Sequence, residues 1–180
     1  MAKRIEIRIS GLGGQGVVLA GEILGRAASQ EGKHVVQTQS YGAEARGSTA
    51  KSEVIIAQEK LVFPLVRKCD ILVAMSKDSI EKYLKDLGKK GTLIVDEDIV
   101  ENVPETKAKV FRVPANKTAQ KLLGSKFYAN VVMLGALTKI TGVVKQEALM
   151  KAISESVREA TREANIRAFK EGIKLDIQQE

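Results

Sequence analysis

A glycine-rich turn between a strand pattern and a helix pattern constrains the fold of this chain more than any other feature. Ile5, Ile7 and Ile9 alternate with polar residues, which predicts a strand. Residues 11–16 read Gly-Leu-Gly-Gly-Gln-Gly, and apolar residues at helical spacing follow from Val17 to Gln30. The turn matches the pattern G-x-G-x-x-G in the context that the pattern requires. Such glycines allow a tight turn and let a phosphate approach the free amides of the helix N-terminus.

The sequence leaves the ligand of this turn open. Proteins that bind NAD usually carry Asp or Glu at the end of the second strand, where the carboxylate binds the ribose hydroxyls. Residues 37–39 read Gln-Thr-Gln here, which disfavours NAD without excluding it. In the alternative interpretation the glycines bind nothing and only let the helix pack close to the strand.

The rest of the chain alternates strand and helix patterns. Further strands are predicted at 35–39, 53–57, 70–75, 92–95 and 110–113. Further helices are predicted at 76–87, 114–123, 130–141 and 146–170. Residues 40–50 read as a loop that is short for a helical crossover, so the strands on either side of it are expected to pair antiparallel. The order predicts a single α/β domain over residues 1–180, a three-layer α/β/α sandwich with a mostly parallel, Rossmann-like sheet.

Composition excludes several kinds of site. The chain has 180 residues with one cysteine and one histidine, so an internal disulfide, a cysteine zinc site, an iron–sulfur cluster and a multi-histidine metal site are excluded. No apolar run is long enough to span a bilayer, and residues 1–8 lack the apolar core of a signal peptide, so we expect a cytoplasmic protein without membrane contact. The net charge of +7 is dispersed and aromatic residues make up only 4%, which disfavours nucleic-acid binding and suits an anionic ligand or an acidic partner.

The loop at residues 40–50 follows a predicted strand and is expected at the same edge of the sheet as the glycine turn. Open α/β sheets bind their ligands at this edge, outside the carboxyl ends of the strands. Tyr41, Glu44 and Arg46 offer a hydroxyl, a carboxylate and a guanidinium in this segment. The alternative is an ordinary surface loop with an ion pair between Glu44 and Arg46.

These two loops carry a family resemblance. Residues 11–17, then 39–47 (Gln-Ser-Tyr-Gly-Ala-Glu-Ala-Arg-Gly), resemble the gamma subunit of the 2-oxoacid:ferredoxin oxidoreductases, and residues 130–137 resemble a later helix of that family. The resemblance covers nearly the whole chain. Residues 37–42 look most like the 2-oxoglutarate enzymes, with the pyruvate enzymes close. Two positions depart from the family: Ala43 stands where proline is common, and Ser48 where a second glycine is common.

The resemblance implies a fold like domain III of the pyruvate:ferredoxin oxidoreductases and a role in the coenzyme A-dependent oxidative decarboxylation of a 2-oxoacid, with 2-oxoglutarate as the expected substrate. It also implies alpha, beta and delta-type partner subunits, which hold thiamine diphosphate, magnesium and iron–sulfur clusters and pass electrons to ferredoxin. This chain would bind none of these cofactors and would shape the entrance for coenzyme A. The residues implied for that contact are Gly11, Gly13, Gly14, Gln15, Gly16, Ser40, Tyr41, Gly42, Glu44, Arg46 and Gly47.

Two other functions stay open as alternatives: a self-sufficient nucleotide-binding enzyme that uses the glycine turn, and a basic nucleic-acid-binding module. We expect the isolated chain to be inactive and able to pair with itself. No catalytic or metal-binding residue is predicted. Cys69 is expected to be buried and inert, and Asp96, Glu97 and Asp98 are expected to form a solvated acidic turn rather than a cation site.

Overall fold

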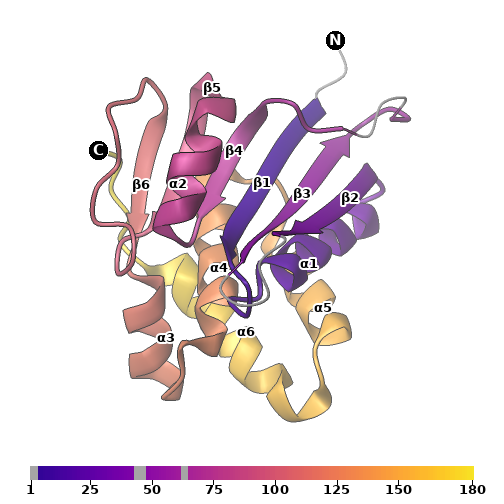
Figure 1. The fold of residues 1–180 in the computed structure, drawn as a ribbon. Coiled ribbons are helices and arrows are strands. Elements are labelled where there is room, and N and C mark those ends of the chain that lie inside the picture. Colours follow the sequence, from indigo (N-terminus) through magenta and orange to yellow (C-terminus); the bar gives the residue numbers. More distant parts are fainter. Residues whose placement is uncertain (1–3, 43–47, 62–64) are drawn as a thin grey trace.

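The computed structural model describes residues 4–42, 48–61 and 65–180, which build one six-stranded sheet with helices on both faces (Figure 1). The strands are β1 (Arg4–Leu12), β2 (His34–Tyr41), β3 (Thr49–Ala57), β4 (Cys69–Ala74), β5 (Leu87–Asp96) and β6 (Lys109–Val113). The helices are α1 (Val17–Gln30), α2 (Lys77–Tyr83), α3 (Ala115–Leu123), α4 (Ala129–Thr141), α5 (Gln146–Ser156) and α6 (Glu159–Lys174), with short 3₁₀ turns η1 (Leu84–Asp86) and η2 (Lys126–Tyr128).

The strand order is β2-β3-β1-β4-β5-β6. β1, β4, β5 and β6 are parallel neighbours, whereas β3 runs antiparallel to both β1 and β2. The predicted α/β fold with a mostly parallel sheet is confirmed, and so is the antiparallel pairing of the second and third strands. The parallel strands and β2 therefore bring their carboxyl ends to one edge of the sheet.

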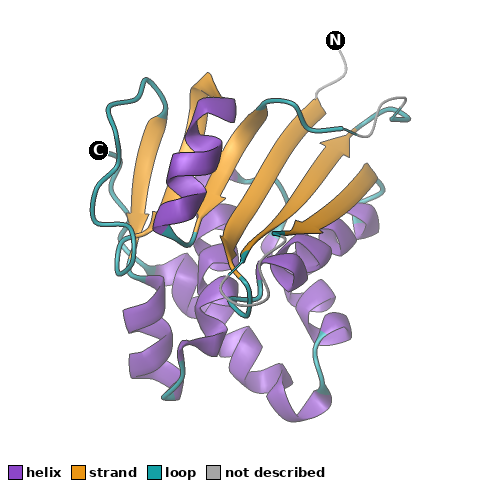
Figure 2. Cartoon of the chain, in the orientation of Figure 1, coloured by secondary structure: helices purple, strands orange, loops and turns teal. Residues whose placement is uncertain are grey.

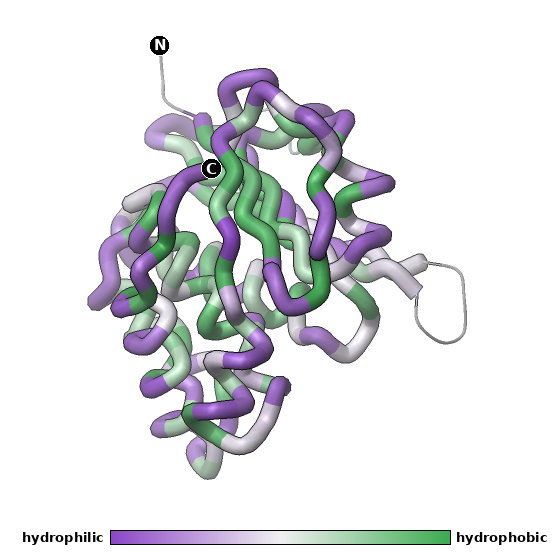
Figure 3. Tube along the Cα trace, turned by 90° about the vertical axis from the view of Figure 1, so that its left-hand side faces the viewer, coloured by the Kyte–Doolittle hydropathy of each residue, from purple (hydrophilic) through white to green (hydrophobic). Residues whose placement is uncertain are grey.

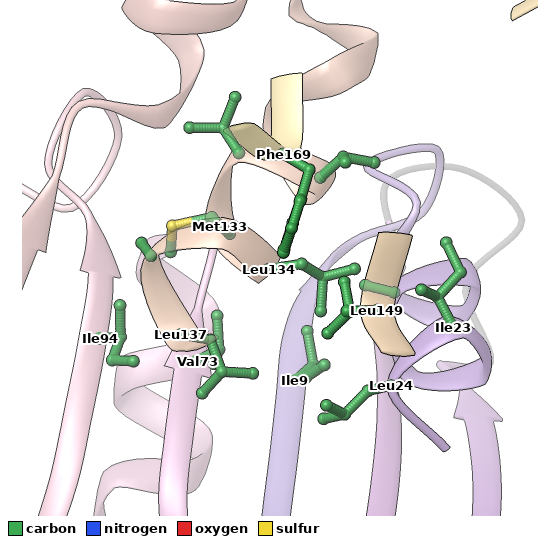
Figure 4. Close-up of a cluster of buried hydrophobic side chains, with 14 of the residues drawn as sticks. Ile9, Ile23, Leu24, Val73, Ile94, Met133, Leu134, Leu137, Leu149 and Phe169 are labelled. Atoms are coloured by element: carbon green, nitrogen blue, oxygen red, sulfur yellow. The ribbon is translucent and has the colours of Figure 1, made fainter. Parts of the chain in front are cut away.

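Helices cover the two faces unequally. α2 lies on one face, and α1, α4, α5 and α6 lie on the other (Figure 2). On the second face, buried side chains from the sheet and from the covering helices meet in one core (Figure 4). They include Ile9, Val73 and Ile94 from the sheet and Ile23, Leu24, Met133, Leu134, Leu137, Leu149 and Phe169 from the helices. α4 is buried over ten consecutive positions, Ala129 to Thr138, because it packs against the sheet on one side (Figure 4) and against other helices, chiefly α6, on the other.

Several predicted boundaries were wrong, and the strand predicted at 92–95 is the longer β5, Leu87–Asp96. The helix predicted for 76–87 is capped by Ser76 as expected but ends at Tyr83, and Gly88 lies in β5 instead of ending a helix. Leu87 pairs with Cys69 of β4, so sheet pairing overrides the helical pattern there. The loop predicted for 40–50 is shorter, because β2 extends through Tyr41 and β3 begins at Thr49.

The last predicted helix, 146–170, is two helices. The backbone of Val157 is extended, with φ −110° and ψ 157°, so α5 ends at Ser156 and α6 begins at Glu159. The break turns α6 back along α4, where Phe169 is almost completely buried. None of the helices in the described ranges has both the length and the apolar character needed to cross a membrane.

Candidate functional site

The glycine turn lies at the carboxyl end of β1, as predicted. β1 continues through Gly11 and Leu12, so the turn itself is residues 13–16. The Gln15 amide donates to the Leu12 carbonyl oxygen at 3.1 Å. Gly14 and Gly16 have left-handed backbones, with φ of +90° and +73°. Only glycine adopts these conformations at little cost.

Gln15 joins the ends of two parallel strands. Its Oε1 accepts from the backbone N–H of Leu12 at 2.6 Å, and its Nε2 donates to the carbonyl oxygen of Met75 at 3.0 Å. The Met75 amide in turn donates to the Ser10 carbonyl oxygen at 2.8 Å. β1 leads to α1 on one face and β4 leads to α2 on the other, so these strand ends flank a topological switch point. Open α/β sheets bind their ligands at such points.

The N-terminus of α1 can receive an anion. Gly16 is its N-cap and has no side chain to bond the first-turn amides, and the first turn contains no acidic residue. The first N–H groups of a helix have no partner within the helix, and the helix dipole adds partial positive charge there. This end of α1 therefore offers donors without a partner inside the helix, and a favourable potential, to a phosphate or carboxylate.

Asn130 fixes this turn from the opposite side and was missed as a site residue in the sequence. Its side chain is 3% exposed, and its Nδ2 donates to the Gly16 carbonyl oxygen at 3.1 Å. Its Oδ1 is buried and has no hydrogen-bond partner in the structure. A Cβ on Gly16 would collide with the Asn130 amide. The available signal was a single asparagine at the start of an otherwise hydrophobic helix.

The structure brings a described end of the second predicted loop, Ser48, next to the glycine turn. The amide of Gly13 donates to the carbonyl oxygen of Ser48 at 2.9 Å, and Gly42 N–H donates to the Thr49 carbonyl oxygen at 2.9 Å. Ser40 and Tyr41 are the last residues of β2 and both are exposed. Glu44, Arg46 and Gly47 lie outside the described residues.

A cavity of about 290 Å³ opens beside the glycine turn, against α3 and η2. Its walls are mainly neutral and apolar, and Lys126 is the only charged residue among them. Phe127, 84% exposed, stands at its rim. The lining residues are Gly14, Gln15, Met75, Asn116, Gln120, Gly124, Ser125, Lys126, Phe127 and Ala129. The cavity thus combines apolar surface, amide groups and one cation.

The acidic turn after β5 is not solvated as predicted. Asp96 is fully buried and accepts hydrogen bonds from the Asn116 side chain and from the Asp98 amide. Burial raises the pKa of Asp96 to about 6, because the charged form loses its hydration there. Asp98 binds the Lys117 ammonium at 2.9 Å and the Lys117 amide at 2.7 Å. These carboxylates hold the start of α3, which carries Asn116 into the cavity wall.

Metal ligands and the single cysteine can be judged directly in the part of the chain that the structure describes. They contain no group of three His, Cys, Asp or Glu side chains that could hold a metal ion. Cys69 is buried, and its desolvation raises its pKa to about 12, so it is a thiol at neutral pH and a poor nucleophile. The N-terminus of α1 and the ammonium of Lys126 give this edge groups that suit an anionic molecule.

Comparison with known proteins identifies the family of the chain. The family model for pyruvate ferredoxin/flavodoxin oxidoreductase matches residues 6–175. The 2-oxoglutarate synthase subunit KorC of Methanothermobacter marburgensis is 50% identical over 179 residues, which cover 96% of each chain. The gamma subunit of a keto/oxoacid ferredoxin oxidoreductase from Geobacter sulfurreducens is 43% identical with a TM-score of 0.85, over 94% of this chain and 96% of that one.

A third similarity shows the fold alone. The 2-oxoglutarate:ferredoxin oxidoreductase of Magnetococcus marinus is 23% identical with a TM-score of 0.86, over 96% of this chain but only 31% of that longer chain. The chain belongs to the pyruvate ferredoxin/flavodoxin oxidoreductase family, as the resemblance predicted. Within that family it is a gamma subunit of an oxoacid:ferredoxin oxidoreductase, an oxidoreductase that functions as a complex.

Proposed function

We propose that this chain forms the coenzyme A side of the active centre in a multisubunit 2-oxoacid:ferredoxin oxidoreductase, and that the 2-oxoacid is 2-oxoglutarate. The substrate follows from the relatives: one at 50% identity and one at 47% identity are both named 2-oxoglutarate synthase subunit KorC. The structure of the Magnetococcus marinus enzyme was obtained with 2-oxoglutarate, coenzyme A and succinyl-CoA bound.

The observation that carries the proposal is the anion-binding end of α1 beside the cavity. Coenzyme A brings phosphate groups, which suit the uncapped amides of α1 and the ammonium of Lys126. Its adenine and pantetheine parts suit a cavity with apolar and amide walls. The proposed contacts are Gly11, Gly13, Gly14, Gln15, Gly16, Ser40, Tyr41 and Gly42, with Glu44, Arg46 and Gly47 added from the sequence.

The carbon chemistry and electron transfer are assigned to partner chains. The single cysteine of this chain is buried, so it cannot supply the thiolate set of an iron–sulfur cluster. The described residues also lack a carboxylate group fit for the magnesium that accompanies thiamine diphosphate. Alpha, beta and delta-type subunits would therefore hold thiamine diphosphate, magnesium and the clusters, and ferredoxin would accept the electrons. This chain would bind and orient coenzyme A without holding a cofactor itself.

The stand-alone nucleotide-binding enzyme is the weaker alternative. Among the residues that line the cavity, Lys126 is the only ionisable side chain, so the cavity has no acid–base pair for an independent reaction. A reaction carried out by this chain alone would have to draw on groups outside the cavity.

Reconstitution tests the proposal. The chain is co-expressed with thiamine-bearing and cluster-bearing subunits of a 2-oxoacid:ferredoxin oxidoreductase, and dye reduction is followed with 2-oxoglutarate or pyruvate, with and without coenzyme A. We expect reduction that requires this chain and coenzyme A and that is faster with 2-oxoglutarate. Full activity of a complex that lacks this chain would contradict the proposal, and faster reduction with pyruvate would contradict the substrate.

A further inference from the structure

The two edge strands of the sheet, β6 and β2, differ in what pairs with their outer sides. The C-terminal segment runs beside β6, where Gln179 forms a bridge with Phe111 and the Glu180 amide donates to the Val110 carbonyl oxygen at 3.0 Å (Figure 3). At the opposite edge, no strand of the described ranges pairs with the outer side of β2. The chain therefore covers one edge and leaves the other open.

The open edge presents a regular row of backbone groups. Gly42 donates to its opposite residue on β3, and hydrogen-bonded pairs alternate along an antiparallel ladder. The N–H and C=O groups of Val35, Gln37, Gln39 and Tyr41 therefore point away from β3. β2 pairs with β3 without a register shift and contains no lysine, proline or carboxylate. These are the devices by which proteins usually block an edge strand.

The side of α1 that lies beyond β2 is also exposed. Gly21 and Gly25 face the sheet, where Gly25 lies level with Gln37 because its added Cβ would be 3.7 Å from the Gln37 Cβ. Glu22 and Arg26 project from the adjacent side of the helix and are exposed. A groove of about 380 Å³ lies there, lined by Glu22, Gly25, Arg26, Ser29, Gln30, Val35, Gln37 and Glu155.

We propose that a second copy of this chain occupies this edge, with the two β2 strands paired antiparallel about a two-fold axis next to Gln37. Paired strands lie about 4.8 Å apart and α1 packs over β2 and β3, so the two α1 helices would lie about 10 Å apart, an ordinary helix-packing distance. The axis reverses the direction of the second helix. Glu22 of each copy then lies within one helical turn of Arg26 of the other copy, which gives two symmetric pairs of opposite charge.

The charges of the groove favour a second copy over another extended chain. An isologous interface needs complementary groups on the same patch, and the groove supplies both signs: the guanidinium of Arg26 and the carboxylates of Glu22 and Glu155. Arg26 is 42% exposed, and its contacts within the chain are long, 3.4 Å to Glu22 and 3.9 Å to Glu155. Its guanidinium is therefore available to a carboxylate of the second copy.

Light scattering coupled to size-exclusion chromatography tests the interface on the full chain at about 1–100 µM, where interfaces of moderate affinity are populated. We expect a dimer for the wild type. Gln39→Pro removes an outward N–H and should give a monomer, whereas the matched control Gln39→Ala keeps that N–H and should stay dimeric. Arg26→Glu should raise the dimer dissociation constant about tenfold or more, because two symmetric ion pairs become repulsive. The double variant Glu22→Arg/Arg26→Glu should bring the dimer dissociation constant back towards the wild-type value.

The charge swap decides the matter even if Gln39→Pro fails to fold. A wild-type monomer over the whole concentration range would overturn the proposal, and so would a dimer that survives both Gln39→Pro and Arg26→Glu. The coenzyme A assay of the reconstituted complex is read separately. Loss of that activity with an intact dimer contradicts the proposed function and leaves this interface standing.

Discussion

Asn130 hydrogen-bonds to Gly16 across 114 residues of sequence, with 3.1 Å between its Nδ2 and the Gly16 carbonyl oxygen. This contact ties the buried helix α4 to the N-cap of α1. It places an amide side chain where a Cβ on Gly16 would lie, so Gly16 is required for space as well as for its left-handed backbone. The position of the N-terminal end of α1 therefore depends on α4 as well as on the glycine turn.

Gly16→Ala should destabilise the protein more than Gly14→Ala. Both residues have positive φ, which costs an alanine about 1–2 kcal/mol. The Cβ on Gly14 meets nothing within 4 Å, whereas the Cβ on Gly16 meets Asn130, which should add about 1–3 kcal/mol for overpacking. Chemical denaturation of the two variants measures the difference. Equal losses would show that Asn130 does not crowd this position.

The same contact predicts non-additive energies. Asn130→Ala alone should cost about 1–2 kcal/mol, because it removes a buried hydrogen bond and leaves space. In the double variant Gly16→Ala/Asn130→Ala the new Cβ would occupy part of that space. The double variant should therefore be more stable than the sum of the two single losses by about 1 kcal/mol in a double-mutant cycle. A coupling energy of zero between the two positions would contradict the contact.

Asp96 should make stability fall as pH rises through the acid range. Burial raises its pKa to about 6 in the folded chain from a reference value of 3.8, so between these values the folded state binds more protons than the unfolded state. From pH 4 to pH 7 this group should remove about 2–3 kcal/mol of unfolding free energy. Asp96→Asn cannot titrate. Its unfolding free energy relative to wild type should thus rise by that amount over the same range, and a constant difference would contradict a raised pKa.

The sequence predicted features that depend on local patterns. The helix predicted from about Val17 to Gln30 is confirmed as α1, since its apolar spacing is regular and Gly32 follows its end. The proximity of the two loops was predictable as well, because the carboxyl ends of β1 and β2 share an edge. What failed depended on distant partners. A glycine after a helical pattern usually marks the end of a helix, but Gly88 lies in a strand of the sheet. The apolar spacing of the last helix continues across Val157, so the sequence did not indicate the break there.

The cavity and the role of Asn130 likewise could not be predicted from local sequence patterns. Asn116 and Lys126 lie far along the chain from Gly14, and only the packing of α3 and η2 against the strand ends brings them together. The burial of Asp96 follows the same rule. An acidic run after a strand usually indicates a solvated turn, but the start of α3 covers this one.

Lys126→Glu should weaken binding of coenzyme A in the assembled enzyme. Lys126 is the only charged residue of the cavity wall, so reversing its charge replaces attraction of a phosphate by repulsion. We expect the KM for coenzyme A to rise about tenfold or more, with the KM for 2-oxoglutarate unchanged. The matched control is Lys121→Glu, an exposed lysine of α3 outside the cavity wall. An equal effect of both variants would indicate a general charge effect and would contradict a role of the cavity in coenzyme A binding.

The most direct test of the central claim separates the two half-reactions by stopped-flow in the assembled enzyme with Arg46→Ala. A guanidinium can bind a phosphate or carboxylate at two points, and loss of a charge-assisted hydrogen bond of about 1.5–3 kcal/mol slows the step that uses it about ten- to a hundredfold. We predict that the coenzyme A-dependent step slows by this factor while the initial decarboxylation keeps its rate, that Arg46→Lys rescues little, and that Lys89→Ala changes neither step. Wild-type rates in both steps for Arg46→Ala, or an equal loss in both, would contradict the claim that this chain forms the coenzyme A side of the site.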